Sequence, residues 1–232
     1  MRWLLGAQLT LAALLVGAEL APALPGLVAP SRAPALDRPT QPGDQTRRYR
    51  PDAPPGAGVD GEMPSRLTAV PERIAGRDGL RLRGAIAPGD GERVAAEIDR
   101  LGPALVALDS PGGSVGDALA IGRALRRAGA DTLVPEGAVC LSACPYVFAG
   151  GVARAAGAGA RIGVHQHAHG ASTILPAFLA VEDMQRGQAE VLDHLSRMGV
   201  DLRIMGPAMA TPPDEIYILS EAELADWAVV TP

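Results

Sequence analysis

The chain has 232 residues, an apolar content of 47% and a net charge of −5 at neutral pH. These values allow one globular domain with appendages and provide enough apolar residues for a buried core. The negative charge and an aromatic content of 3% exclude a basic, base-stacking surface, so no nucleic-acid partner is expected. All 21 basic residues are arginine, which excludes a lysine general base.

The N-terminal residues have the pattern of an export signal. Met1-Arg2-Trp3 precedes a mainly apolar run from Leu4 to Ala18, and Ala21-Pro22-Ala23 offers small residues for cleavage. We expect a signal peptide or an N-terminal membrane anchor over 1–23, with membrane anchoring through 3–18 if the segment is retained. Both alternatives predict a periplasmic or otherwise extracytoplasmic location.

The next segment, 24–72, is rich in Pro, Gly, Ala, Asp and Arg and has no sustained apolar period. Such a composition cannot offset the entropy of ordering by burial, so a disordered Pro-rich linker is predicted. A single domain is expected over 73–232.

Within that domain, apolar periodicity predicts strands alternating with helices. Strands are expected over 80–86, 104–108, 132–134, up to Cys140, and over 161–166, 215–219 and 229–230. Helices are expected over 91–101, 114–128, 143–150, 176–198, 201–209 and 221–226, and a loop over 167–174. This alternation indicates an α/β fold with a mostly parallel sheet and right-handed crossovers.

A glycine turn, Ser110-Pro111-Gly112-Gly113-Ser114, follows the strand over 104–108. Proline fixes one backbone angle and the glycines permit conformations closed to other residues, so backbone amides can point into open space. Ser114 is placed to cap the next helix. A tight strand-to-helix turn without a ligand is the alternative.

Ser142 and His165 are the candidate catalytic side chains. Ser142 lies where a buried strand passes into a helix, at a sheet edge where open α/β folds bind ligands. His165 ends an apolar strand and can act as a general base while neutral near pH 7. An N-cap serine and a structural histidine are the alternative interpretations.

His165, His167 and His169 alternate, which in an extended chain places three imidazoles on one face, as in some metal sites. No cysteine pair or acidic residue with ligand spacing joins them. We therefore expect no metal and no cofactor. His194, in the predicted long helix, is expected at the surface.

Cys140 and Cys144 flank Ser142 and are the only two cysteines of the chain. In an exported protein they form a candidate disulfide that pins the turn carrying the serine. Two small buried thiols are the alternative, because this spacing closes only in some conformations. A catalytic cysteine is less favoured, since the serine takes the turn position.

Together these motifs resemble the Clp protease proteolytic subunit of the Clp/crotonase superfamily, and especially its exported, uncharacterised relatives. The similarity covers about 80–231 and rests on the Ser-Pro-Gly-Gly turn, on Ser142-Ala143 and on Val164-His165-Gln166. The resemblance implies a repeated β-β-α spiral with a mostly parallel sheet. It also implies Ser142 as nucleophile, His165 as base and the amides of Gly113 and Ala143 as the oxyanion hole.

The third triad member implied by the resemblance is Asp214, which precedes the segment from Tyr217 to Ala222. The interval from Asp214 to Ser220 is longer than in the family, which leaves Glu215, or no acid, as alternatives. The signal peptide peptidase branch of the superfamily uses a Ser-Lys dyad. A chain without lysine cannot supply that dyad.

The resulting expectation is an exported Clp-like serine endopeptidase that hydrolyses unstructured peptides through an acyl-enzyme. The family also implies self-association into a homo-oligomer. One alternative is a crotonase-type enzyme that stabilises a thioester enolate, which does not suit an extracytoplasmic location. The other is a non-catalytic Clp-fold binding or assembly module, for which Ser142→Ala would change nothing.

Overall fold

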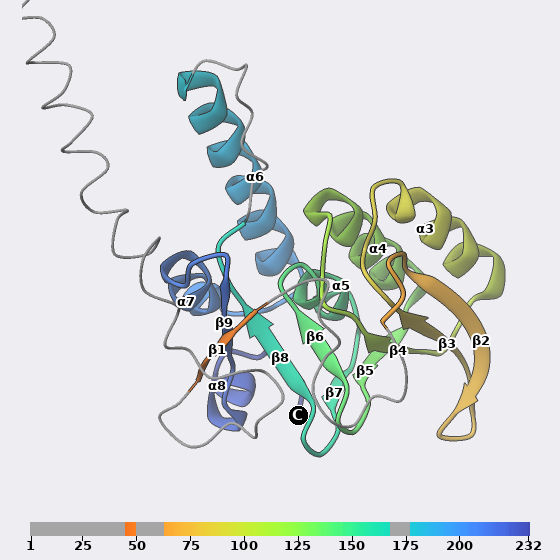
Figure 1. The fold of residues 1–232 in the computed structure, drawn as a ribbon. Helices are drawn as coiled ribbons and strands as arrows, with labels where there is room; N and C mark the ends of the chain where they lie inside the picture. Colours follow the sequence, from red (N-terminus) through yellow and green to blue (C-terminus); the bar gives the residue numbers. More distant parts are fainter. Residues whose placement is uncertain (1–44, 50–62, 168–176) are drawn as a thin grey trace, which may run out of the picture. The chain divides into compact units, whose positions relative to one another are not determined.

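The computed structural model describes residues 45–49, 63–167 and 177–232, all within one compact unit, Pro34–Pro232 (Figure 1). These residues form a mixed α/β structure with two mixed sheets. The expected signal or anchor over 1–23, most of the expected linker and His169 lie outside the described residues.

The larger sheet has five strands in the order β2-β3-β4-β5-β7. They are β2 (Thr68–Ile74), β3 (Arg77–Arg83), β4 (Leu105–Asp109), β5 (Asp131–Val134) and β7 (Arg154–Ala156). The β2–β3 pair is an antiparallel hairpin, and the other pairs are parallel. Every residue of β4 is buried, as expected of a strand covered on both faces.

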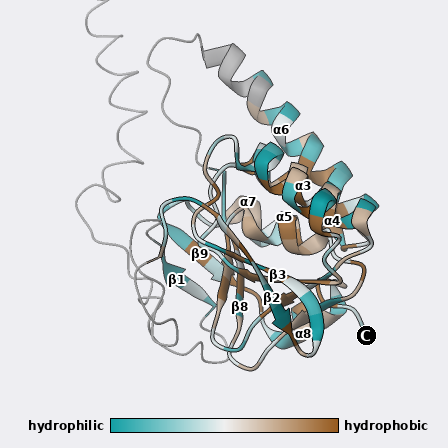
Figure 2. Ribbon diagram, turned by 90° about the vertical axis from the view of Figure 1, so that its right-hand side faces the viewer, coloured by the Kyte–Doolittle hydropathy of each residue, from teal (hydrophilic) through white to brown (hydrophobic). Residues whose placement is uncertain are grey.

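Two amphipathic helices, α3 (Asp90–Leu101) and α4 (Val115–Ala128), pack against each other beside this sheet. Their hydrophilic and hydrophobic residues lie on different sides (Figure 2). Ser114 is the N-cap of α4, and its hydroxyl accepts a hydrogen bond from the Asp117 amide, as predicted. The main core fills the space between these helices and the strands.

The smaller sheet has the order β1-β9-β8-β6. Its strands are β1 (Thr46–Arg48), β9 (Glu215–Ile218), β8 (Arg161–Val164) and β6 (Val139–Leu141). Only β6 and β8 are parallel to each other, so this sheet is less parallel than the sequence predicts. One of its faces carries a small separate cluster made by Tyr49, Val139, Leu141, Ile216 and Ile218.

Four further α-helices follow the strands: α5 (Cys144–Ala149), α6 (Ala177–Arg197), α7 (Met205–Ala210) and α8 (Glu221–Asp226). A 3-10 turn, Leu202–Ile204, leads into α7, and α6 extends away from the sheets (Figure 1). Among the described residues, none of these helices combines the length and apolarity that a membrane span requires.

The expected linker contributes two strands. β1 and β2 both lie at least partly within 24–72, where only disorder was predicted. β2 has no buried residue and is held by backbone pairing with β3 across a turn at Ala75 and Gly76, both with positive φ. β1 likewise uses the backbone edge of β9. Strands held mainly through the backbone leave little apolar pattern in the sequence.

Two smaller predictions are also corrected, and one strand was missed. No strand forms at Val229-Val230, because both amides bond back to the Leu224 carbonyl behind α8. β7 was not predicted. His194, expected at the surface, is 2% exposed, and its Nε2 lies 2.8 Å from the Tyr146 carbonyl oxygen where α6 meets α5.

Candidate active site

The turn that carries Ser142 joins β6 to α5. Ser142 has φ +60°, in the left-handed region that residues other than glycine rarely adopt. Its amide donates to the Gly163 carbonyl of β8 at 2.9 Å, which fixes the turn against the neighbouring strand. Backbone strain of this kind costs energy and clusters at functional sites. The conformation leaves Ser142 partly exposed, while Leu141 and Ala143 on either side are buried.

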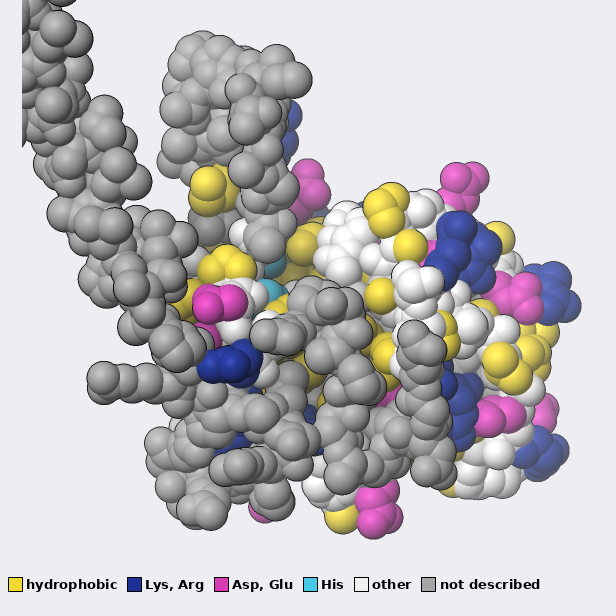
Figure 3. All heavy atoms as spheres, viewed as in Figure 1, with side chains coloured by type: hydrophobic (Ala, Val, Ile, Leu, Met, Phe, Trp, Pro, Cys, Tyr) yellow, Lys and Arg dark blue, Asp and Glu magenta, His cyan; other side chains and the backbone are white. Residues whose placement is uncertain are grey.

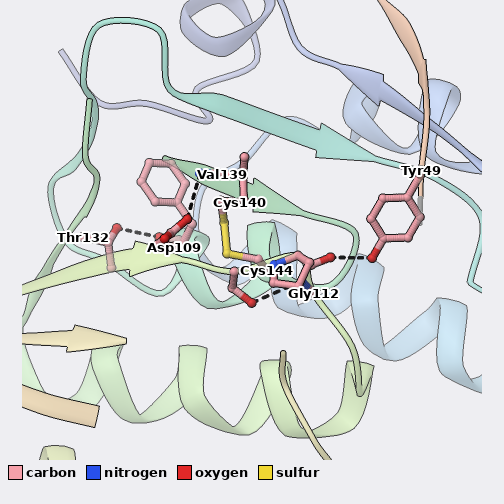
Figure 4. The surroundings of a disulfide bond; sticks show 10 residues. Tyr49, Asp109, Gly112, Thr132, Val139, Cys140 and Cys144 are labelled. Atoms are coloured by element: carbon pink, nitrogen blue, oxygen red, sulfur yellow. Dashed lines mark hydrogen bonds between the residues drawn. A yellow bond between two sulfur atoms is a disulfide. The ribbon is translucent and has the colours of Figure 1, made fainter. Parts of the chain in front are cut away.

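A disulfide spans this turn. The Cys140 and Cys144 sulfurs are bonded at 2.01 Å, and the two Cα atoms are 5.0 Å apart (Figure 4). Both residues are fully buried, so the bond links the end of β6 to the start of α5 inside the core. Ser142 is the middle residue of the closed loop. The bridge therefore restrains the backbone that presents the serine hydroxyl.

His165 follows directly after β8 and reaches Ser142. The parallel register of β6 and β8 pairs Leu141 with Gly163, which brings the two strand ends together. The His165 Nε2 atom lies 2.7 Å from Ser142 Oγ, a normal hydrogen-bond distance. The structure thus places the predicted nucleophile and the predicted base in contact, with the geometry that activation of a serine requires.

The surroundings of His165 favour its neutral form. The ring is 6% exposed. The pKa of His165 is lowered from 6.5 to about 4, mainly by burial; nearby His167 adds to the shift, and the carbonyl oxygens of Pro213 and Pro212 oppose it. His165 is therefore an uncharged imidazole throughout the physiological range.

Within 45–49, 63–167 and 177–232, no carboxylate completes a triad through a hydrogen bond. His165 Nδ1 is buried and makes no hydrogen bond of normal geometry with any described residue, although the Pro212 and Pro213 carbonyl oxygens lie near the ring. The expected partner, Asp214, has an exposed side chain, and its backbone carbonyl accepts from the Tyr49 amide. The structure therefore does not join Asp214 or Glu215 to His165 in this way.

The glycine turn lies against the serine turn. Ser110 pairs with Cys140 in a parallel bridge, and the Ser110 hydroxyl accepts from the Gly112 amide at 3.1 Å. Gly112 has φ +98°, and a Cβ there would lie 2.6 Å from Ser142 Cβ and 2.8 Å from the Ala143 nitrogen. Only glycine allows this approach of the two turns.

Two amides beside Ser142 are available to a ligand. The Ile86 amide donates to the Gly112 carbonyl, and the Ile86 carbonyl accepts from the Ser114 amide. The Gly113 N–H between them therefore points away from Ile86. Neither this amide nor that of Ala143 donates a hydrogen bond to a described residue. Paired free amides next to a serine are the donors that an oxyanion hole requires.

Tyr49 is a site residue that the sequence did not reveal. Its side chain, 6% exposed, comes from the residue after β1, and its hydroxyl donates to the Pro111 carbonyl at 2.5 Å (Figure 4). Its ring meets that of His165 edge-on, with centroids 4.8 Å apart. The tyrosine hydroxyl also interacts with the Ser142 side chain, and burial raises the pKa of Tyr49 to about 12.

A pocket of about 240 Å³ opens beside the base. Its lining combines the segment from His165 to His167 with residues of α6 and α7, namely Met184, Gln188, Met205, Ala208 and Met209. Figure 3 shows histidine side chains among hydrophobic ones near the foot of α6. Three methionines give the pocket an adaptable apolar wall.

His167 Nε2 lies 2.8 Å from the Tyr146 hydroxyl. Within the described part of the chain, no three His, Cys, Asp or Glu side chains gather as a metal-binding group. His169, the third histidine of the alternating motif, lies outside that part.

No known family model matches the chain, and no curated protein matches it significantly. A functional assignment therefore depends on the geometry of the site.

Proposed function

We propose that the chain is an exported serine endopeptidase that hydrolyses unstructured peptides through an acyl-enzyme. The observation that carries the proposal is the 2.7 Å contact between Ser142 Oγ and His165 Nε2. The contact occurs at a strained turn, beside the unengaged amides of Gly113 and Ala143. A nucleophile, a base and oxyanion donors together are the requirements for acyl transfer.

In this mechanism, Nε2 of His165 takes the Ser142 proton as Oγ bonds to the substrate carbonyl carbon. The Gly113 and Ala143 amides stabilise the negative oxygen of the tetrahedral intermediate. Cleavage of the C–N bond releases the amine, which takes the proton from His165. A water molecule, deprotonated by the same imidazole, then hydrolyses the Ser142 ester and restores the serine.

Carbonyl oxygens near Nδ1 take part of the role that an acid has in a triad. The Pro212 and Pro213 carbonyls can only accept hydrogen bonds, so they favour the tautomer with hydrogen on Nδ1 and a lone pair on Nε2. That tautomer is the one a base needs. A neutral carbonyl stabilises the imidazolium less than a carboxylate does, so turnover slower than that of a complete triad is part of the proposal.

The pocket supports a substrate with an apolar side chain next to the scissile bond. Its methionines accommodate varied shapes, and His165 forms part of its wall. Because an ATP-driven unfoldase is not expected outside the cytoplasm, the proposed substrates are unstructured peptides. The disulfide supports an oxidising, extracytoplasmic location such as the periplasm.

The fold proposed is the β-β-α spiral of the Clp/crotonase superfamily. Support comes from the mixed α/β architecture and from the Ser-Pro-Gly-Gly turn packed against the serine turn. Self-association into a homo-oligomer is proposed with it. Light scattering of the purified chain tests this part independently of activity, because it measures mass alone.

The proposal is tested by incubating the full chain with a mixture of unstructured peptides and identifying the products by mass spectrometry. We expect cleavage after apolar residues, and a mass increase on Ser142 when the acyl-enzyme is trapped by rapid acidification. Ser142→Ala should remove both signals. Cleavage that persists in Ser142→Ala would contradict the proposal.

A second function, a peptide-binding module without turnover, is favoured by one observation, the buried Nδ1 of His165 without a hydrogen bond. It predicts that the parent and Ser142→Ala bind the same peptides with equal affinity and that neither cleaves them. The same experiment therefore separates the two functions.

A further inference from the structure

Tyr49 stands out among the residues around His165 because it comes from a distant part of the chain. β1 pairs antiparallel with β9, matching Arg47 with Ile216, and the Tyr49 amide donates to the Asp214 carbonyl at 2.9 Å. At the other end, the Gln45 carbonyl accepts from the Ile218 amide at 2.7 Å. This short strand thus delivers an aromatic ring to the side of the sheet where His165 lies.

The ring of Tyr49 has three contacts in the site. Its edge-on contact with the imidazole restricts rotation of His165. Its hydroxyl is fixed on the Pro111 carbonyl of the glycine turn, and it interacts with the Ser142 side chain. One side chain therefore touches the base, the nucleophile and the turn that carries an oxyanion amide.

We propose that Tyr49 is the positioning residue of the Ser142–His165 pair and holds the imidazole where a triad would use a carboxylate. The inference rests on the proposed peptidase function. In this role the phenol ring sets the orientation of His165 and shields it from water. The strand β1 is then part of the active site, and the domain needs it for full reactivity.

The alternative role for a strand of this kind is a plug that blocks the nucleophile. Two observations oppose it. Ser142 stays partly exposed with Tyr49 seated, whereas His165 is buried. The pocket beside His165 also remains open, and Tyr49 does not line it. Tyr49 therefore covers the base and leaves Ser142 partly exposed and the pocket beside His165 open.

Shielding by Tyr49 has a measurable consequence for the base. Burial is the main reason that the pKa of His165 is lowered to about 4. Replacing Tyr49 leaves in place the other described groups that act on the ring, His167 and the carbonyls of Pro212 and Pro213. Removal of the phenol ring should admit water and raise the pKa of His165 toward 6.5.

The test uses the full chain with ¹³C-labelled histidine. An NMR titration measures the pKa of His165, assigned with His165→Gln, in the parent, Tyr49→Ala and Tyr49→Phe. We expect a midpoint near 4 in the parent and in Tyr49→Phe, and a midpoint close to 6.5 in Tyr49→Ala. An unchanged midpoint in Tyr49→Ala would overturn the proposal for Tyr49 without using any activity.

Reaction with a fluorophosphonate supplies the second readout. At neutral pH the rate of Ser142 labelling should fall roughly tenfold in Tyr49→Ala, the upper range for an edge-on ring contact, and stay within about threefold in Tyr49→Phe. Tyr217→Phe is the matched control, since it removes a hydroxyl bonded to Gln45 in the same pair of strands without touching His165. It should label at the parent rate.

Faster labelling of Tyr49→Ala would overturn the proposal in favour of the plug. If Tyr49→Ala does not fold, as judged by circular dichroism, Tyr49→Leu replaces it, because leucine fills much of the space without an aromatic edge. The same fall in rate is expected. No labelling of the parent would instead contradict the proposed peptidase function, and with it the catalytic meaning of Tyr49.

Discussion

Ser142 Oγ and His165 Nε2 lie 2.7 Å apart, although neither residue belongs to a strand or a helix. Each follows directly after one of two parallel strands, β6 and β8, whose pairing sets their separation. Backbone pairing, the Cys140–Cys144 disulfide and the close approach of Gly112 fix the serine side of the contact. On the histidine side, the described residues that restrain the imidazole are the Pro212 and Pro213 carbonyl oxygens and the ring of Tyr49.

Replacement of Asp214 by Asn should have little effect. The Asp214 side chain is exposed, and His165 Nδ1 makes no hydrogen bond to a described residue. We expect fluorophosphonate labelling of Asp214→Asn within about twofold of the parent, whereas loss of the right tautomer in a complete triad costs about 10⁴-fold. A loss above a hundredfold, with folding intact, would show that Asp214 orients His165 after all.

In the pH profile of labelling, the acid limb should lie at an unusually low pH. Burial lowers the pKa of His165 to about 4, so the rate should be nearly constant from about pH 8 to pH 5 and fall as the imidazole gains a proton near pH 4. The groups around the ring, His167 and the Tyr49 phenol among them, supply no negative charge that would raise this value at these pH values. A midpoint near 6.5 would contradict the burial of His165.

The lowered pKa of His165 also makes the stability of the fold depend on pH. Because the folded pKa lies below the unfolded value of 6.5, the unfolded chain binds the proton first as the pH falls. The contribution of His165 is therefore complete above pH 6.5 and is lost toward pH 4. Chemical denaturation of the parent and of His165→Gln across this window measures the difference.

Gly112→Ala should remove both reactivity and stability. A Cβ at this position would lie 2.4 Å from the Leu141 carbonyl oxygen, in addition to the strain of φ +98°. We expect a loss of about 3 kcal/mol of unfolding free energy from strain and overlap together, measured by chemical denaturation. Gly129→Ala is the matched control, because Gly129 has φ +68° with open space around it. It should lose only about 1 kcal/mol and label normally.

Equal losses of stability in Gly112→Ala and Gly129→Ala would mean that the glycine turn does not press against the serine turn.

Opening the disulfide should weaken both the fold and the site. The loop between Cys140 and Cys144 has a sequence separation of only four, so the chain-entropy contribution to stability is about 2 kcal/mol. The same loop holds Ser142 at its strained φ, and we expect the labelling rate to fall severalfold in the Cys140→Ala, Cys144→Ala double variant. Denaturation and labelling measure the two effects separately.

A reductant is the internal control for that variant. It should lower the labelling rate of the parent to that of the double variant and leave the double variant unchanged. Parent protein with both thiols shown to be free and a normal labelling rate would contradict the role assigned to the bridge.

The sequence was sufficient to predict that the serine, the histidine and the glycine turn lie close together. These residues lie at the ends of buried strands with strong apolar patterns, and parallel strands place such ends at one edge. The α/β class follows from the same alternation. The cysteine pair was predictable as a candidate because both residues flank the turn, although only the structure shows the bond.

The surroundings of the His165 ring could not be predicted from the sequence, and the reasons are physical. β1 is a three-residue polar strand held by backbone pairing, and such a strand has no apolar period to find. Tyr49 lies in a Pro-rich region whose composition predicts disorder. The carbonyls of Pro212 and Pro213 act through backbone atoms, which leave no side-chain signal. The expected Asp214 depended on a resemblance whose spacing differs at this point.

The central claim, an activated serine, is tested most directly by labelling the full chain with a fluorophosphonate. The full chain is needed because a fragment limited to 80–232 would lack β1, β2 and the start of β3. The account predicts stoichiometric labelling located at Ser142 by mass spectrometry, and its loss in both Ser142→Ala and His165→Ala. A folded parent that does not react, or a His165→Ala variant that labels as fast as the parent, would contradict it.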